Sequence, residues 1–455
     1  MREWKLLMAS MTLMLVMTWV PFSFAAVSPD EAAKLGTTLT GIGAEMAGNA
    51  DGTIPPYTGG LTTPPANFVP GSGIYPDPFA AEKPLFSVNA QNMAQYADKL
   101  SEGTKAIMKK HSTFRIDVYK THRTVVLPDN VLKNTAKNAL KATTYNGGLS
   151  VKGARAGIPF PIPKTGYEVM WNHLLRYSGR AIEIKMRSFL RDVNRLTVSG
   201  GMTIWEENPY YDEDTTRADA NIFWKFRCLY DFPPRKAGEA FIIFDPVNMY
   251  EKGRVAYQYL PGQRRVKLAP ELGFDTPNSN VSGLSTFDES YCFNGSMERY
   301  DFKLIGKKEV YIPYNAYRAK FQGTSEQIFG PKHLNPDFLR WELHRVWVVE
   351  ATLKPGKRHI YPKRRLYIDE DSWIAHLAEN YDAKGFLQMF DWIASVQLYD
   401  AYIPEAHFNG AYNLIADTYM VESWAGASEG GYNRPAKVRP ERDWTPASLA
   451  GQGIR

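Results

Sequence analysis

The sequence predicts a mainly β fold with helices, an α+β protein in which helices precede an antiparallel sheet. From about residue 180 onwards, short runs alternate in polarity or are rich in β-branched and aromatic residues, with turn signals between them. No long helical pattern separates these runs, and strands that follow one another through short turns pair antiparallel. Aromatic residues make up 13% of the chain, and aromatic side chains favour strands.

Residues 1–25 have the pattern of a cleaved secretory signal. Arg2 and Lys5 precede an apolar stretch from Leu6 to Val20, and Ser23 and Ala25 supply small residues before a cleavage site after Ala25. The apolar stretch is shorter than the roughly 20 residues that span a bilayer. The sequence therefore predicts export and a soluble periplasmic protein.

The rest of the chain divides into three parts. Residues 26–84 are rich in Gly, Pro and Thr without a sustained apolar period, which predicts an extended arm lying along the protein body. Residues 85–425 are predicted to form the β domain, which begins with helices near 89–110, 128–141 and 164–177. Residues 426–455 return to a Gly, Pro and polar composition and are predicted to be an irregular tail.

Two hairpins are the clearest elements of the predicted sheet. One joins 344–353 to 358–368 through a turn at 354–357, and the other joins 373–381 to 386–399 through a turn at 382–385. The two cysteines, Cys228 and Cys292, fit either a disulfide in an oxidising compartment or two buried thiols. On a strand, Cys228 would share a face with Phe226 and Tyr230.

Several motifs carry a resemblance to known families. The segment GRVAYQYLPGQRRVKLAP (253–270), and the series Val346–Glu350, Leu366–Trp373 and Glu379–Gly385, resemble strand and turn units of the outer-membrane lipoprotein-sorting (LolA/LolB-like) proteins. Over nearly the whole mature chain, the sequence resembles the DUF1329 family of proteobacterial envelope proteins. This closer resemblance is carried by segments such as AAKLGTTLTGIGAEMAGNADGTIP, GIPFPIP, WNHLLRY, YLPGQRRV and FNGSMERYDFKLIGKKEVYIPYN.

The resemblance implies a strongly curved antiparallel sheet, an incomplete barrel, with helices plugging its concave face around an apolar cavity. Members of the larger group are chaperones of acyl chains or lipoproteins. The resemblance also implies association with outer-membrane proteins and with RND-type exporters of hydrophobic molecules, and only transient membrane contact.

Alternating strand faces supply the candidate ligand-binding residues. Such a face can pack as ordinary core or can line a cavity, and on a cavity-forming fold the second role is predicted. The predicted cavity residues are Tyr257, Tyr259, Trp347, Val349, Phe390 and Trp392. Arg264 and Arg265 are predicted to lie at the cavity mouth, and the basic run Lys363–Arg365 is expected on a solvent-facing side of its strand.

The sequence contains no catalytic, metal or nucleotide motif in a fitting context. Ser428 lies in a Gly-x-Ser-x-Gly pattern, but the last histidine, His407, precedes it, whereas a nucleophile-elbow serine needs a later histidine. The eight histidines lack metal-ligand spacing, and the acidic clusters 212–214 and 369–371 are expected to be solvated turns without a calcium-loop pattern. Gly41-Ile-Gly43 lacks the third glycine of a dinucleotide fingerprint, and no block of Lys and Arg indicates nucleic acid.

The predicted function is a non-enzymatic periplasmic carrier of a lipid or another hydrophobic molecule, without cofactor or metal, that serves transport between the inner and outer membranes. The alternative is an accessory envelope protein that docks on an RND-type exporter or an outer-membrane protein through a sheet edge or its N-terminal arm.

Overall fold

The computed structural model describes residues 26–192 and 195–450. The predicted signal sequence, residues 1–25, lies outside the described residues. Among the described residues, no helix is both long and apolar enough to cross a membrane.

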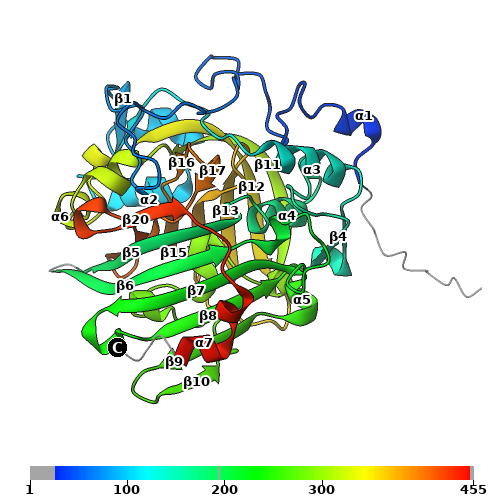
Figure 1. The fold of residues 1–455 in the computed structure, drawn as a ribbon. Helices are drawn as coiled ribbons and strands as arrows, with labels where there is room; N and C mark the ends of the chain where they lie inside the picture. The colour runs from blue at the N-terminus through cyan, green and yellow to red at the C-terminus, as the bar shows by residue number, and fades with distance from the viewer. Residues whose placement is uncertain (1–25, 193–194, 451–455) are drawn as a thin grey trace, which may run out of the picture.

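A single large sheet dominates the fold (Figure 1). Within the described part of the chain, sixteen strands join it, in the order β1-β2-β12-β13-β14-β15-β18-β19-β5-β6-β7-β8-β9-β10, with β11 paired to β12 and β20 paired to β5. The strands are β1 Phe86–Asn89, β2 Arg115–Val118, β5 Ala181–Arg191, β6 Leu196–Glu207, β7 Ile222–Phe232, β8 Ala240–Pro246, β9 Val255–Leu260, β10 Arg265–Leu268, β11 Tyr300–Pro313, β12 Trp341–Leu353, β13 Lys363–Asp369, β14 Ala375–Tyr381, β15 Leu387–Ile393, β18 Asn409–Asn413, β19 Thr418–Trp424 and β20 Tyr432–Pro435.

The predicted class, mainly β with helices, is confirmed. Among the strands of the described residues, all pairs are antiparallel except for one parallel contact between β2 and β12. Two small hairpins lie outside the large sheet, formed by β3 Thr143–Tyr145 with β4 Ser150–Lys152 and by β16 Val396–Leu398 with β17 Ile403–Glu405. Both predicted hairpins are present, but each contains a strand that is shorter than predicted. β13 begins at Lys363 rather than at 358, because residues 354–362 form a longer connection than a tight turn. β15 ends at Ile393 rather than at 399, because residues 396–398 form β16 of a separate hairpin.

The helices are short, and the longest follow the predicted segments. Of the predicted helix 89–110, only the second half is an α-helix, because Ser101 caps a new helix start by accepting a hydrogen bond from the Thr104 N–H. The helices are α1 Pro29–Ala32, α2 Glu102–Lys110, α3 Asp129–Ala139, α4 Gly166–Leu174, α5 Met249–Lys252, α6 Ser325–Ile328 and α7 Pro446–Ala450.

Helix α4 is a core helix that packs against β11 and β12. Its apolar residues surround the helix axis, and nearly all of its side chains are buried, as expected for a helix without a solvent face. His173 ties it to its surroundings, because its ring nitrogens contact the carbonyls of Trp373 (3.1 Å) and Phe293 (3.0 Å). Burial lowers the pKa of His173 to about 3, so this histidine is neutral and structural.

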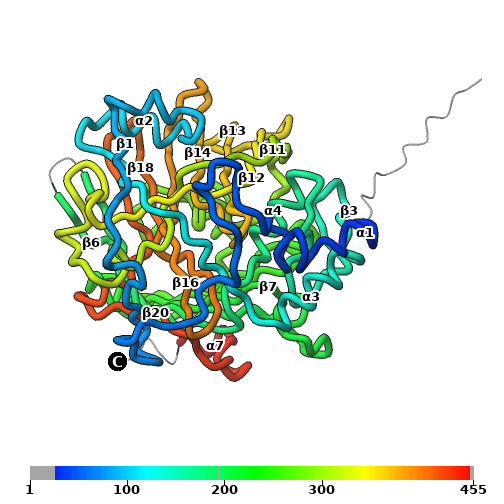
Figure 2. Tube along the Cα trace, turned by 90° about the horizontal axis from the view of Figure 1, so that it is seen from above, coloured from blue at the N-terminus to red at the C-terminus, as the bar shows by residue number. Residues whose placement is uncertain are grey.

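Residues 26–84 run across the body of the protein (Figure 2). They contain α1 and otherwise turns and isolated bridges. Tyr75 anchors this stretch, since it is buried against Phe321 and Tyr399 and donates a hydrogen bond to Asp400. The Gly73 carbonyl accepts a hydrogen bond from the Asn433 N–H of β20.

The C-terminal segment is more ordered than its composition predicts. Strand β20 lies beside β5, and α7 packs on β8, β9 and β10 (Figure 1). Trp444 and Leu449 cover the side of the sheet formed by Ile242 and Tyr259. Short elements of this kind are stabilised by tertiary packing rather than by their own propensity, so a Gly- and Pro-rich pattern does not reveal them.

Candidate ligand-binding site

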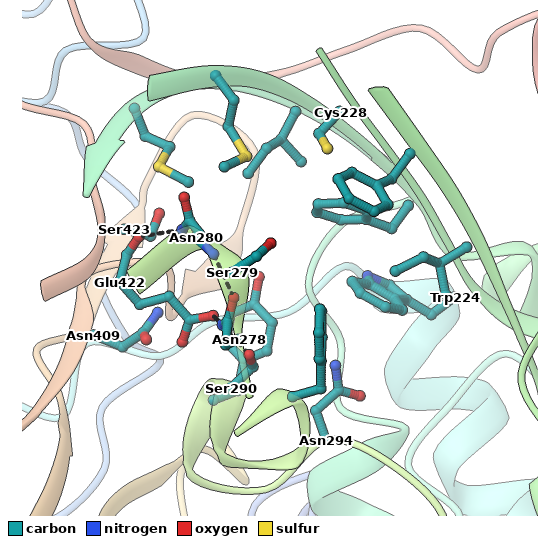
Figure 3. Close-up of a pocket in the computed structure, with 18 of the residues that line it drawn as sticks. Trp224, Cys228, Asn278, Ser279, Asn280, Ser290, Asn294, Asn409, Glu422 and Ser423 are labelled. Atoms are coloured by element: carbon teal, nitrogen blue, oxygen red, sulfur yellow. Dashed lines mark hydrogen bonds between the residues drawn. The ribbon is translucent and has the colours of Figure 1, made fainter. Parts of the chain in front are cut away.

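An apolar cavity of about 90 Å³ lies between strands β5–β8 and the connection from β10 to β11. Its wall on the sheet side is formed almost entirely by large apolar side chains, and its opposite wall is formed by residues of the connection (Figure 3). The sheet contributes Met186, Met202, Ile204, Trp224, Phe226, Cys228, Tyr230, Phe241 and Ile243.

Strand β7 shows why this wall is apolar. Successive side chains of a strand point to opposite faces, so Trp224, Phe226, Cys228 and Tyr230 all face the cavity. Lys225, which points the other way, forms ion pairs on the side covered by the C-terminal segment. The apolar character of this wall therefore follows from the alternation of side chains along the strand.

Both cysteines are free and buried, which answers the question that the sequence left open. Burial raises the pKa of the Cys228 thiol to about 12 and holds that of Cys292 well above its usual range. Cys228 therefore contributes a neutral, essentially apolar surface to the cavity wall.

The covering segment, residues 269–299 between β10 and β11, contains three 3-10 turns: η5 Ser279–Val281, η6 Phe287–Cys292 and η7 Met297–Arg299. It is held from behind by buried charges: Asp288 lies 3.3 Å from a guanidinium nitrogen of Arg364 on β13 and 3.0 Å from His359. Burial alone would raise the pKa of Asp288, but Arg364 and His359 lower it to about 2. The segment is thus anchored to one half of the sheet while it covers the other half.

One end of the cavity is polar. Glu422 of β19 accepts hydrogen bonds from Asn278 (2.8 Å) and from the Ser290 hydroxyl (2.7 Å), and both partners belong to the covering segment. Burial raises the pKa of Glu422, which favours its neutral form. In Figure 3, Glu422 and Asn409 mark this end, and Trp224 and Asn294 lie at the opposite end.

A second, smaller cavity of about 30 Å³ adjoins the first. The two share Trp224, Tyr291 and Asn294 as lining residues. The second cavity is also lined by Arg176, which follows α4, and by the charged residues Glu206, Glu405 and His407.

His407 links the two carboxylates of this second cavity. Its ring nitrogens lie 2.7 Å from Glu405 and 3.2 Å from Glu206. Burial would lower the pKa of His407, but the two carboxylates raise it to about 9, so the imidazole is protonated at neutral pH. Lys320 pairs with Glu405 from the other side, and together with His407 it lowers the pKa of Glu405 to about 2 against the effect of burial.

Among the described residues, one group of side chains has the proximity of metal ligands: His344, Asp369 and Asp371. Both oxygens of Asp371 already accept hydrogen bonds from Arg123, at 2.7 and 2.8 Å. Burial would lower the pKa of His344, but Asp369 and Glu342 raise it to about 9, so this ring is a cation without a free lone pair. The group is therefore a charge-compensated network, and its ligand atoms do not suit a metal ion, because those of Asp371 are engaged by Arg123 and the ring of His344 is protonated.

This network corrects one expectation about the acidic clusters. Residues 369–371 are not a solvated turn, because all three side chains are buried and paired with Arg123, Lys307, His344 and Arg345. The cations come from segments far away in the sequence, and no local pattern shows them. Residues 212–214 do form a largely exposed turn.

The six predicted cavity residues do not line this cavity, and they do not come together at another common site. Tyr257 and Tyr259 pack with α7 on the other side of the sheet, and Val349 belongs to the main core. Trp347 lies against Trp373 and beneath the Lys307 ammonium. Phe390 contacts Gly103 of α2, and Trp392 packs edge-on against Phe408.

The predicted basic residues differ in their exposure to solvent. Arg264 and Arg265 are exposed at the turn between β9 and β10. Within the run Lys363–Arg365, however, Arg364 is fully buried, so the expectation of a solvent-facing run is wrong at its centre. Three buried carboxylates, Asp288, Glu289 and Asp391, lie around it and account for its burial.

The residues that do line the cavity include several that the sequence interpretation did not select. The run around β7 is recognisable as a strand, and its alternation places Phe226, Cys228 and Tyr230 on one face. What the pattern cannot show is that this face meets the loop-like segment 278–294 rather than a helix.

A family model and a relative each match most of the chain. The family described as "Protein of unknown function (DUF1329)" matches residues 87–450. An uncharacterized protein of Pseudomonas aeruginosa, PA3922, is 39% identical over 436 residues, which cover 95% of each chain.

Two solved structures are more distant. They are a putative outer-membrane lipoprotein-sorting protein domain from Vibrio parahaemolyticus (17% identity, TM-score 0.42) and a DUF1329 family protein from Desulfovibrio piger (13% identity, TM-score 0.42). Each match covers 62% of this chain and 97% of the other chain.

Proposed function

The chain belongs to the DUF1329 family, for which no function is described, and from that premise we propose that it is a carrier of a lipid or another hydrophobic molecule. The ligand would occupy the cavity between β5–β8 and the covering segment. The carrier would be exported by residues 1–25 and would work in the periplasm without catalysing a reaction.

The observation that carries this proposal is the apolar lining of the cavity. Nine mainly apolar side chains from four neighbouring strands, eight of them large, face a space that protein atoms do not fill. Transfer of an apolar group from water into such a space contributes about 0.8 kcal/mol for each CH₂ group. An apolar ligand gains from this transfer, and the proposal needs no covalent chemistry.

The size of the cavity indicates how a ligand enters. Sites for small molecules usually enclose about 300–1,000 Å³, so a cavity of about 90 Å³ holds only part of a lipid. The wall opposite the sheet consists of turns and connections, which move more easily than paired strands. We expect the covering segment to move outward when a whole chain is bound.

Partners belong to the same proposal. A carrier between two membranes receives and delivers its cargo at membrane proteins or lipid surfaces, and an RND-type exporter and an outer-membrane protein are the partners that we propose.

The test is to purify the mature protein from a native periplasm, extract it with organic solvent and identify the extract by mass spectrometry. A stoichiometric hydrophobic compound is the expected result. In parallel, the protein emptied by extraction is titrated with an apolar fluorescent probe. An empty protein that also fails to bind the probe contradicts the carrier function.

A pair of variants on β6 links binding to this cavity. Ile204 lines the cavity and the adjacent Thr203 points to the other face of the strand. Ile204→Trp is expected to fill the space and weaken probe binding at least about tenfold, whereas Thr203→Trp is expected to leave it unchanged. Equal binding by both variants would place the probe elsewhere.

A further inference from the structure

We propose that the ligand is an anionic amphiphile whose carboxylate or phosphate headgroup pairs with Arg176 while its apolar chain occupies the cavity beside β7. This inference rests on the proposed carrier function and names the class of its cargo. It starts from Arg176, a partly buried arginine that, among the described residues, has no carboxylate at ion-pair distance, unlike Arg123, Arg254 and Arg364.

Arg176 lies directly after α4 and lines the second cavity. One of its nitrogens donates a hydrogen bond to the His173 carbonyl (2.7 Å). Its Nε is buried and has no hydrogen-bond partner. Among the described residues, no carboxylate lies within ion-pair distance of this guanidinium.

Arg254, which lines the first cavity, is paired with a carboxylate. Its guanidinium donates two hydrogen bonds to Asp245, both of 2.7 Å. Arg123 and Arg364 are likewise buried and paired with carboxylates. Withdrawing a cation even partly from water without a counter-charge is costly, so a partner that arrives with the ligand would relieve this cost at Arg176.

The neighbouring carboxylates are already engaged. Glu206 accepts hydrogen bonds from His407 and from the Tyr291 hydroxyl (3.1 Å), and Glu405 is paired with Lys320 and His407. With His407 protonated, Arg176, Lys320 and His407 give three positive charges against two carboxylates. Among the described residues of this cluster, Arg176 is therefore the cation that lacks a carboxylate at ion-pair distance.

The two cavities adjoin each other close to Arg176, so a single amphiphile could place its chain in one and its headgroup in the other. The guanidinium lies 5.2 Å from the ring centre of Tyr291, a residue that lines both cavities. Trp224 and Asn294, which are also shared, lie at the end of the apolar cavity away from Glu422 (Figure 3). A chain in the first cavity would thus extend its head toward Arg176 and away from that carboxyl group.

A purely structural role is the competing explanation. Arg176 contacts the last turn of α4, and cations at helix C-termini are stabilising. In that structural role Arg176 uses one N–H group and would not distinguish charged from neutral ligands. In the ligand-binding role its guanidinium would recognise a carboxylate or phosphate group by paired hydrogen bonds. Selectivity for charge therefore separates the two explanations.

The experiment measures displacement of the apolar probe by three ligands with the same sixteen-carbon chain: palmitate, hexadecyl phosphate and 1-hexadecanol. The emptied protein is expected to bind at least one of the two anions about tenfold or more tightly than the alcohol. The tighter of the two anions identifies whether a carboxylate or a phosphate is the natural headgroup.

Arg176→Gln is expected to remove the preference for the anion and to leave alcohol binding within about twofold. Arg176→Lys is expected to retain part of the preference. The matched control is Arg180→Gln, since Arg180 lies on the same connection but pairs with Asp212 and lines neither cavity.

Equal binding of all three ligands by the unaltered protein would overturn the anionic headgroup and leave the carrier function standing. Loss of alcohol binding in Arg176→Gln would show that Arg176 keeps the cavity intact and does not select the headgroup by its charge. This result would also overturn the proposal. Failure of all three ligands and of the probe would instead contradict the carrier function itself.

Discussion

The sheet has two halves whose inner faces are covered in different ways. Against β11–β15, α4 and a set of buried ion networks fill the space, and His173, Arg364 and Asp369 are fully or almost fully buried. Against β5–β8, the cover is the segment from β10 to β11, and a cavity remains beneath it. The same kind of antiparallel strand thus forms a closed core in one half and leaves room for a ligand in the other. The covering element, rather than the strand, determines which of these outcomes occurs.

The largest expected effect tests the closed half. Arg364→Met removes the guanidinium that contacts Asp288, Asn380 and the Cys292 carbonyl, all of them buried. Removal of one partner from a buried ionic network costs about 3–5 kcal/mol, and we expect the free energy of unfolding in urea to fall by that amount.

Arg365→Met is the matched control for this variant. Arg365 points to the opposite face and pairs with Glu350 at a partly exposed position. An exposed pair contributes about 0–1 kcal/mol. Equal decreases in the free energy of unfolding of the two variants would mean that the buried network stabilises the closed half no more than an exposed ion pair does.

The second prediction concerns pH. Burial raises the pKa of Glu289 from 4.5 to about 7, although Arg364 acts in the opposite direction. Between these two pH values the folded protein binds this proton and the unfolded chain does not, so this group makes the free energy of unfolding fall as the pH rises. Glu289→Gln keeps a neutral side chain throughout, and we expect it to gain roughly 2–3 kcal/mol over the unaltered protein across this window.

Urea denaturation at the two ends of the window measures this difference. Glu350→Gln is the control, because Arg365 lowers the pKa of Glu350 and its contribution changes only below pH 4.5. If the free energy of unfolding of Glu289→Gln and that of the unaltered protein changed with pH in parallel, the ionisation of Glu289 would not destabilise the folded state.

A third prediction compares the two cysteines: Cys228 lies in the cavity wall on β7, whereas Cys292 lies in the part of the covering segment that packs against β14 and β15. Cys292→Leu adds volume to a filled core, and overpacking costs about 1–3 kcal/mol. Cys228→Leu adds the same volume where the cavity can receive it, so we expect a change in stability below about 1 kcal/mol and a clear loss of probe binding. Similar destabilisation of both variants would mean that the space beside Cys228 is not available.

The sequence predicts elements better than it predicts what covers them. The class, both hairpins, α3 and α4 and the shared face of Cys228 and Tyr230 follow from local patterns of alternation and capping. The cavity residues do not, because any apolar face can meet core, cavity or a distant segment. Tyr259 illustrates this, since its face is covered by Leu449, almost two hundred residues later.

Charge follows the same rule. Asp371 and Arg364 have the sequence context of surface residues, and each is buried because a partner of opposite charge comes from a distant segment, Arg123 in one case and Asp288 in the other. Arg176 shows the converse, because its sequence context gives no sign that its carboxylate partner is missing. Such positions are recognised only when the elements are assembled.

The smallest expected effect concerns motion of the cover. The backbone of residues 276–286 is joined mainly by turn hydrogen bonds within the segment, such as the one from the Val281 N–H to the Asn278 carbonyl, whereas β12 has strands on both sides. Local opening costs less where few buried contacts and ladder hydrogen bonds must break. In hydrogen–deuterium exchange we therefore expect 276–286 to exchange faster than β12, and a saturating ligand to slow 276–286 while it leaves β12 unchanged. Slowing in β12 but not in the cover would place the ligand in the closed half and reverse the roles assigned to the two halves of the sheet.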